Sequence, residues 1–388
     1  MQTLTNLFRN NILQYGMIIA LVFITGLFWV LTEGITFTPL NLTNLILQNG
    51  FILVLAVGMV LVIITGNIDL SVGSAVAFVG AIAGVLMINH DVPVGLAIIL
   101  SILVGALIGV WQGFWIAYAG IPSFIVTLAG MLIFRGLTLY LLDGQSLAPF
   151  PDSFGMLSGG FLPDIPGTGD LHVLTLLLTG ILSLVLIYLE VRKRKNQIQY
   201  NFEVFPLWIT VTKLALLILV INWLAYQLAL NKGIPMVLII VFALIVIYTF
   251  VMNNTVMGRH IYATGGNKKA ADLSGIKTKR VVFWVFVNNG VIAALAGLMF
   301  ASRLNSATPA AGNMLELDAI AAVFIGGASM AGGVGTIIGA IVGGLVMGVM
   351  NNGMSLIGVG IDWQQAIKGM VLLLAVGFDV YNKNRSGK

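Results

Sequence analysis

The fold of this chain is decided by residues 45–64, LILQNGFILVLAVGMVLVII. The stretch has no charged side chain, and an α-helix needs about 20 mostly apolar residues to cross the hydrocarbon core of a membrane. Similar runs recur along the whole sequence and predict about twelve membrane-spanning segments. These segments are 15–31, 45–64, 70–88, 94–118, 122–142, 171–189, 206–230, 234–252, 281–301, 317–329, 335–350 and 363–380.

The composition agrees with an all-α, polytopic helical membrane protein. Of the 388 residues, 59% are hydrophobic and 9% are charged, whereas soluble domains carry about 25% charged residues. The absence of cysteine excludes disulfides and thiolate metal sites. His90, His172 and His260 are too far apart to suggest a zinc site, so we expect no metal and no cofactor on this chain.

The placement of charged residues predicts the orientation. Lys and Arg gather at 192–195, in 253–280 and in the tail after residue 380, whereas loop 143–170 carries four Asp and no Lys or Arg. The positive-inside rule therefore places both termini and the basic segments in the cytoplasm, and loop 143–170 outside. The net charge of +5 reflects this topology and does not indicate nucleic-acid binding. Run 317–329 is short, so it is either a half-span or a re-entrant segment.

The chain is predicted to be one transmembrane domain, 1–388, without a soluble domain. The longest polar stretch, 253–280, is too short to bury a core of its own. The phosphate-binding pattern G-x-x-x-x-G-K-[ST] does not occur. We therefore expect no enzymatic activity on this chain, and ATP hydrolysis, where it is needed, on a separate polypeptide.

Segment 253–280 is predicted to hold a short cytoplasmic helix. Gly265 and Gly266 interrupt the preceding structure, Asn267 can cap a helix, and Gly275 suits the left-handed position that ends one. The two helical turns between Asn267 and Gly275 carry a small apolar surface. The candidate contact residues in them are Lys268, Ala270, Ala271, Leu273 and Ser274. A helix this short needs a surface to dock on. It is either a contact for a partner ATPase or a loop on the membrane surface.

Several long motifs resemble one family, the bacterial ABC-type permeases for ribose, xylose, galactose and arabinose. The motifs are YATGGNKKAADLSGIKTKR (262–280), ITGNIDLSVGS (64–74), IPSFIVTLAGMLIFRG (121–136), ELDAIAAVFIGGASMAGGVGT (316–336) and NNGMSLIGVGIDWQQAIKG (351–369). The resemblance is strongest to the xylose and multiple-monosaccharide permeases, which share an extension of two spans at 171–230. It implies a homodimer in the lipid bilayer, a cytoplasmic ATP-binding subunit, an extracytoplasmic sugar-binding protein, and a coupling helix at 267–275.

Two charged residues near or within the spans have competing interpretations. Asp69, at a predicted cytoplasmic turn, is either a helix cap placed favourably in the helix dipole or a second contact for the ATPase. Arg135 lies in the outer half of its span and is a candidate for the translocation pathway. Its guanidinium could donate to sugar hydroxyls, pair with a carboxylate such as Asp143, or extend to the membrane surface.

Four further polar residues are candidates. Asn288 and Asn289 lie a third of the way into their span and either bond a neighbouring helix or line the pathway. Glu316 and Asp318 are expected at the outer end of a span, where acidic residues suit the helix dipole or contact the sugar-binding protein.

Two other functions compete with the ATP-driven permease. An ion-coupled sugar transporter that uses protons should keep a carboxylate near the bilayer centre, and the predicted carboxylates lie at span ends. Sodium coupling stays open, because backbone carbonyls can hold sodium. A passive channel requires rings of pore residues, which a single sequence does not reveal. The sequence does not name the sugar.

Overall fold

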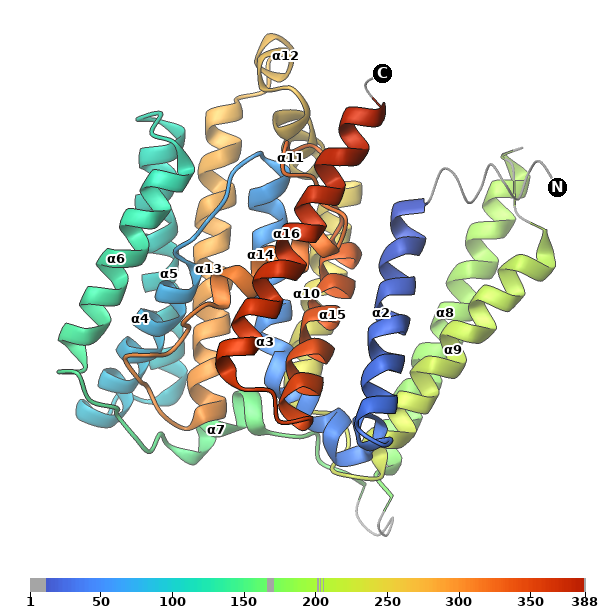
Figure 1. Cartoon of the computed structure of the whole chain (residues 1–388), viewed down its shortest axis with the longest axis horizontal. Helices are drawn as coiled ribbons and strands as arrows, with labels where there is room; N and C mark the ends of the chain where they lie inside the picture. The colour runs from blue at the N-terminus through green and yellow to red at the C-terminus, as the bar shows by residue number, and fades with distance from the viewer. Residues whose placement is uncertain (1–11, 166–170, 201, 203, 205, 387–388) are drawn as a thin grey trace.

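The computed structural model describes residues 12–165, 171–200, 202, 204 and 206–386, and they form a bundle of helices (Figure 1). The helices are α2 (Ile12–Leu31), η1 (Ile35–Phe37), α3 (Pro39–Ile64), α4 (Val72–Gly84), η2 (Val85–Asn89), α5 (Val94–Ala117), α6 (Ser123–Leu141), α7 (Asp152–Gly159), α8 (Val173–Gln199), α9 (Leu207–Ala229), α10 (Met236–Asn254), α11 (Val256–Gly266), α12 (Lys268–Leu273), α13 (Thr278–Leu304), α14 (Leu315–Ile325), α15 (Ile337–Leu356) and α16 (Ile361–Ser386). Among these residues, nine helical stretches are long and apolar enough to cross a membrane.

Every predicted apolar run coincides with a helix, so the prediction of a polytopic helical membrane protein is confirmed. Run 70–88 forms α4 together with the π-helical turn η2. Run 317–329 forms α14, whose 11 residues extend about 16 Å, roughly half the thickness of the hydrocarbon core. The half-span interpretation of this run is therefore correct.

The centre of the bundle is built from α3 and α13. Almost every side chain of α3 from Gly50 to Ile64 is buried, because this helix is apolar on all sides and is surrounded by other helices. The contact between α5 and α13 depends on small residues. A Cβ atom on Gly105 or Gly109 would overlap the backbone of α13, and one on Gly290 would overlap the backbone of α5. Small residues at this spacing allow membrane helices to pack backbone against backbone.

Two connections turn back into the bundle instead of ending at a membrane surface. Residues 65–71 descend from the end of α3 to the middle of the bundle, where α4 begins (Figure 1). Residues 305–314 return in the same way from the end of α13 to the start of α14. We call 65–71 and 305–314 the re-entrant segments. The helices that follow these segments, α4 and α14, begin inside the bundle and run toward its opposite ends. We call α4 and α14 the half-helices.

The two ends of the bundle differ in charge, as predicted. Helix α12 and the last turns of α16 lie at one end, and α7 with the described part of the acidic loop lies at the other (Figure 1). We call these the basic end and the acidic end. The positive-inside rule assigns the basic end to the cytoplasm. The predicted cytoplasmic N-terminus, and Asp170 of the acidic loop, lie outside the described residues.

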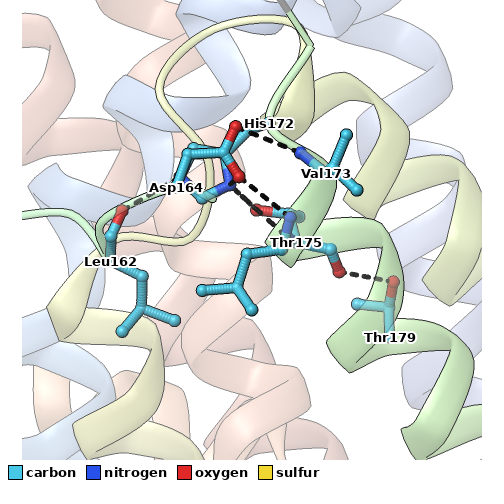
Figure 2. Close-up of polar contacts among 7 residues, drawn as sticks. Leu162, Asp164, His172, Val173, Thr175 and Thr179 are labelled. Atoms are coloured by element: carbon cyan, nitrogen blue, oxygen red, sulfur yellow. Dashed lines mark hydrogen bonds and ion pairs between the residues drawn. The ribbon is translucent and has the colours of Figure 1, made fainter. Parts of the chain in front are cut away.

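The predicted extension forms a hairpin of α8 and α9 at the edge of the bundle. At the acidic end, the carboxylate of Asp164 accepts hydrogen bonds from the backbone N–H groups of Val173 (3.3 Å) and Leu174 (3.0 Å), the first residues of α8 (Figure 2). His172 lies 3.5 Å from the same carboxylate, and its other ring nitrogen is 2.9 Å from the carbonyl oxygen of Leu162. These contacts attach the start of the hairpin to the acidic loop.

Candidate functional site

The segment from α11 to α13 contains the predicted short helix. The side-chain oxygen of Asn267 accepts a hydrogen bond of 3.0 Å from the N–H of Ala270, which caps α12. Gly275 adopts the left-handed backbone conformation, with φ of +85°, just beyond the helix. The hydroxyl of Thr278 donates to Asp272 over 2.6 Å and ties α12 to the first turn of α13. The cap and the stop predicted from the sequence are both present.

The apolar residues of α12 point in different directions. Ala271 is 5% exposed and packs inside the protein, whereas Leu273 is 90% exposed at the basic end. Ala270, Lys268 and Ser274 are exposed as well. The apolar surface that α12 offers to a partner is therefore Leu273 with the smaller Ala270, and Ala271 of the expected face is buried.

Helix α11 connects α12 to the ends of α3 and α14. A Cβ atom on Gly265 would overlap the carbonyl oxygen of Ile64, the last residue of α3. The same carbonyl accepts a hydrogen bond of 2.8 Å from the N–H of Gly333, in the turn after α14. The hydroxyl of Tyr262 donates to the carbonyl of Gly335 over 2.8 Å. Direct contacts therefore link the α11–α12 segment to the end of α3 and to the turn after α14.

Asp69 lies inside the bundle and not at the cytoplasmic surface where the sequence suggested it. Its Oδ1 accepts hydrogen bonds from the backbone N–H (2.9 Å) and the hydroxyl (2.7 Å) of Ser71. Its Oδ2 accepts one of 2.8 Å from Asn289, near the middle of α13. Gln112 of α5 donates in turn to the hydroxyl of Ser71. Asp69 is 2% exposed, so a cytoplasmic partner cannot contact it in this conformation.

The two neighbouring asparagines of α13 face different helices. Asn289 turns toward the re-entrant segment 65–71, as described above, whereas Asn288 accepts a hydrogen bond from the hydroxyl of Tyr248 on α10. Asn288 therefore makes the interhelical contact that is the usual role of Asn in membrane helices, whereas Asn289 bonds a segment between two helices.

Arg135 of α6 holds the second re-entrant segment. Its guanidinium donates to the carbonyl oxygens of Ala311 (2.6 Å) and Pro309 (3.2 Å), just before α14. A guanidinium is a strong donor in a fixed geometry, so it can fix an irregular backbone segment within a membrane. Of the alternatives left open by the sequence, neither pairing with Asp143 nor extension to the membrane surface describes these two carbonyl contacts.

Glu316 and Asp318 occupy the first turn of α14 and are buried there, at 7% and 4% exposure. A Cβ atom on Gly73 of α4 would overlap Oε2 of Glu316, so the starts of α4 and α14 lie against each other. This oxygen has no hydrogen-bond partner among the described residues. Asp318 forms an ion pair of 3.0 Å with Lys368 of α16. Both acids lie in the interior and not at the outer surface expected from the sequence.

The structure thus brings together Asp69, Arg135, Asn289 and Glu316, which the sequence had assigned to different places. It also adds residues that the sequence analysis missed, namely Ser71, Gln112 and Lys368. Gln364 and Lys368 are four residues apart in a predicted membrane helix, so they lie on the same face of it. This spacing could have indicated a polar face in the sequence. No group of three potential metal ligands occurs in the described part of the chain.

Similarity to known proteins identifies the family of this chain. The family model described as "Branched-chain amino acid transport system / permease component" matches residues 41–376. The xylose transport system permease protein of Haemophilus influenzae is 39% identical over 375 residues, which cover 97% of this chain and 98% of that protein. Its counterpart in Escherichia coli K12 is 38% identical over 97% of this chain and 94% of that protein.

A ribose import permease protein of Bacillus subtilis is 36% identical over 88% of this chain and 85% of that protein. No solved structure matches the chain significantly. Both the family model and the relatives cover far more than half of the sequence, including the two re-entrant segments and the α11–α12 segment. This chain therefore belongs to the family of branched-chain amino acid transport system permease components, and it is a membrane permease.

Proposed function

We propose that this permease imports a monosaccharide of the xylose, arabinose, galactose or glucose class across the cytoplasmic membrane and is driven by ATP. The names of its relatives, xylose and ribose permeases, support the sugar class. In this proposal ATP is hydrolysed on a separate cytoplasmic subunit. Two copies of the permease form the pathway, and an extracytoplasmic binding protein delivers the sugar.

One observation carries the ATP-driven part of the proposal: α12 is a short, capped helix at the basic end that presents Leu273. A helix of 6 residues is unstable alone in water, yet here Asn267 and Thr278 hold it in place. A single projecting leucine with Lys268 and Lys269 beside it suits an apolar pocket with an acidic rim on a partner protein.

The experiment replaces Leu273 with Asp in the permease co-expressed with its ATP-binding subunit. An apolar anchor in a docked interface contributes at least about 2 kcal/mol, so association should weaken roughly 30-fold or more. Co-purification and sugar-dependent ATP hydrolysis measure the loss. The matched control is Ile198→Asp, which changes an exposed apolar residue near the end of α8. Normal assembly and transport by Leu273→Asp would refute α12 as the coupling contact.

The orientation of the permease in the membrane can be tested separately by labelling single cysteines, because the chain has no native cysteine. A single Cys in place of Leu273 should react with a membrane-impermeant maleimide only from the cytoplasmic side. A Cys in place of Met156, exposed on α7, should react only from the outside. The opposite labelling pattern would invert the bundle and remove α12 from contact with any cytoplasmic protein.

Transport in sealed vesicles separates this proposal from the ion-coupled alternative. The complete complex should accumulate sugar when ATP is present on the α12 side and should show no dependence on a sodium or proton gradient. Accumulation driven by an ion gradient without ATP would establish the ion-coupled transporter instead.

A further inference from the structure

A groove that combines a charged pair and three amide side chains with a largely apolar lining lies between α14, α15 and α16. Its volume is about 320 Å³, at the lower end of the range of about 300–1,000 Å³ for sites of small molecules. We call it the charged groove. The lining residues that matter here are Asp318, Gln364, Gln365 and Lys368 on its polar side and Met314 and Leu317 on its apolar side.

The Asp318–Lys368 ion pair lies in the wall of the charged groove. The carboxylate is almost completely buried, with 6% of its side chain exposed, whereas 24% of the lysine side chain is exposed. An ammonium group has three donors, and the contact with Asp318 uses one of them at 3.0 Å. Lys368 therefore keeps donors for a ligand, and the carboxylate holds it in place.

The depth of these residues excludes a simple surface role. Lys368 lies seven residues after the start of α16, about 10 Å along the helix axis. Asp318 belongs to a half-helix that begins in the interior of the bundle. Charged and amide side chains at such depth face other protein or a water-filled cavity, because contact with lipid is costly. The exposed side of α16 around Gln365 and Lys368 is therefore directed to a polar space and not to lipid.

The chemistry of the charged groove fits a neutral polyhydroxyl ligand. Sugar hydroxyls both donate and accept hydrogen bonds, and the groove offers an acceptor in Asp318, donors in Lys368, and both in Gln365. Gln364 offers its side-chain oxygen as an acceptor, because its NH₂ group already donates to Val359 and Ser355. The ion pair has no net charge, so it attracts neither anions nor cations strongly. Met314 and Leu317 supply apolar surface for the carbon side of a sugar ring.

We propose that the charged groove is a transient binding site for the transported monosaccharide within the permease. The site rests on the proposed function, since it assigns a position to the sugar of that importer. The site also links sugar binding to a movement of α14. Asp318 is in the first turn of α14, and the turn after α14 contacts α3 and α11 at the basic end. A shift of α14 would open or close the groove.

The first test detects sugar in the groove directly. In the purified permease, Gln365→Cys provides one thiol in the groove, and its modification by a maleimide is timed with and without xylose, arabinose or galactose. We expect the sugar to slow the reaction several-fold, and glycerol at equal osmolarity to have no effect. Met156→Cys, on α7 outside the groove, should react at the same rate throughout. A reaction rate of the Gln365→Cys variant that no sugar changes, whether fast or slow, overturns the proposal.

The second test measures transport by the complete complex with its ATP-binding subunit and binding protein. Replacing Lys368 with Met removes hydrogen bonds from a charged donor, each of which contributes about 1.5–3 kcal/mol. Sugar flux per assembled complex should therefore fall at least about tenfold. The variant Asp318→Asn/Lys368→Gln removes both charges together, so no unpaired charge remains to unfold the protein, and it should show the same loss. Lys213→Met on α9 is the matched control.

The outcomes separate the two proposals. If the wild-type complex imports no sugar with ATP, the proposed function fails and the charged groove fails with it. If the wild-type complex imports sugar and the Asp318→Asn/Lys368→Gln variant does so equally well, the importer stands and the groove is refuted.

Discussion

The half-helices α4 and α14 begin side by side in the interior, yet their carboxylates are held differently. Asp69, just before α4, uses both oxygens in hydrogen bonds to Ser71 and Asn289. Glu316, in the first turn of α14, leaves one buried oxygen without a partner among the described residues. Two residues later, Asp318 pairs with a lysine that lines the charged groove.

This difference indicates that the carboxylate at the start of α4 is held by more hydrogen bonds than the Glu316 carboxylate at the start of α14. Hydrogen bonds to both carboxylate oxygens hold Asp69 in place, and in this network it is Oδ1 of Asn289 that has no partner among the described residues. An unpartnered buried oxygen costs free energy that a second arrangement of the same helix could recover. The three predictions that follow would break or sharpen this distinction, and they are given from the largest expected effect to the smallest.

Gly73→Val should have the largest effect, because it separates the two half-helices. The added Cβ atom would overlap both the carboxylate of Glu316 and the backbone of Gly312. We expect a loss of about 3 kcal/mol, at the upper end for overpacking. The unfolding temperature and the yield of monodisperse permease measure it. Gly136→Val on α6 is the control, since nothing lies within 4 Å of a Cβ atom there. Equal stability of the two variants would contradict the contact.

Asp69→Asn and Glu316→Gln both replace a carboxylate by an amide, the first at the start of α4 and the second at the start of α14. Asp69→Asn places an amide N–H₂ opposite a donor and should cost about 1–2 kcal/mol of stability. Glu316→Gln removes a buried carboxylate oxygen that has no partner among the described residues, so its stability should change little while flux per folded molecule falls. Thermal unfolding and vesicle transport measure the two effects. The distinction between the halves is lost if both variants lower the unfolding temperature equally.

Of the substitutions expected to lower stability, Arg135→Lys should have the smallest effect. A single ammonium can keep one carbonyl contact, to Ala311 or to Pro309, but cannot reproduce the rigid geometry of the guanidinium. We expect a loss of about 0.5–1 kcal/mol and a clear reduction in flux, because the segment before α14 becomes less well positioned. Flux per folded protein equal to that of the wild type would show that Arg135 serves structure alone.

The sequence predicted the spans and the short helix well, because both depend on local properties. Apolar runs of membrane length appear directly in the sequence, and the cap at Asn267 and the stop at Gly275 involve neighbouring residues. The direction of the α12 side chains was not predictable in the same way. A helix of 6 residues is too short for periodicity to show that Ala271 faces inward and Leu273 outward.

The central polar cluster could not be located from the sequence. An acidic residue at the start of a helix suits the helix dipole equally well at a membrane surface and in a protein interior. Asp69, Glu316 and Asp318 therefore looked like residues at span ends. Only the return of 65–71 and 305–314 into the bundle places them at half depth. The pairing of Lys368 with Asp318 joins residues fifty positions apart and depends entirely on how α14 and α16 pack.

The chain segments just before and just after the α8–α9 hairpin are joined by backbone hydrogen bonds. The N–H of Leu162 donates to the carbonyl of Ile234 over 3.0 Å, and the N–H of Met236 donates to the carbonyl of Gly160 over 2.9 Å. Where the inserted segment starts and where it ends, the chain is therefore already adjacent. A tight turn of about two residues can span such a junction, so deletion of the hairpin would leave the rest of the chain connected and would remove the hairpin's contacts with the bundle, such as the hydrogen bond of 3.0 Å from Asn231 to Thr43.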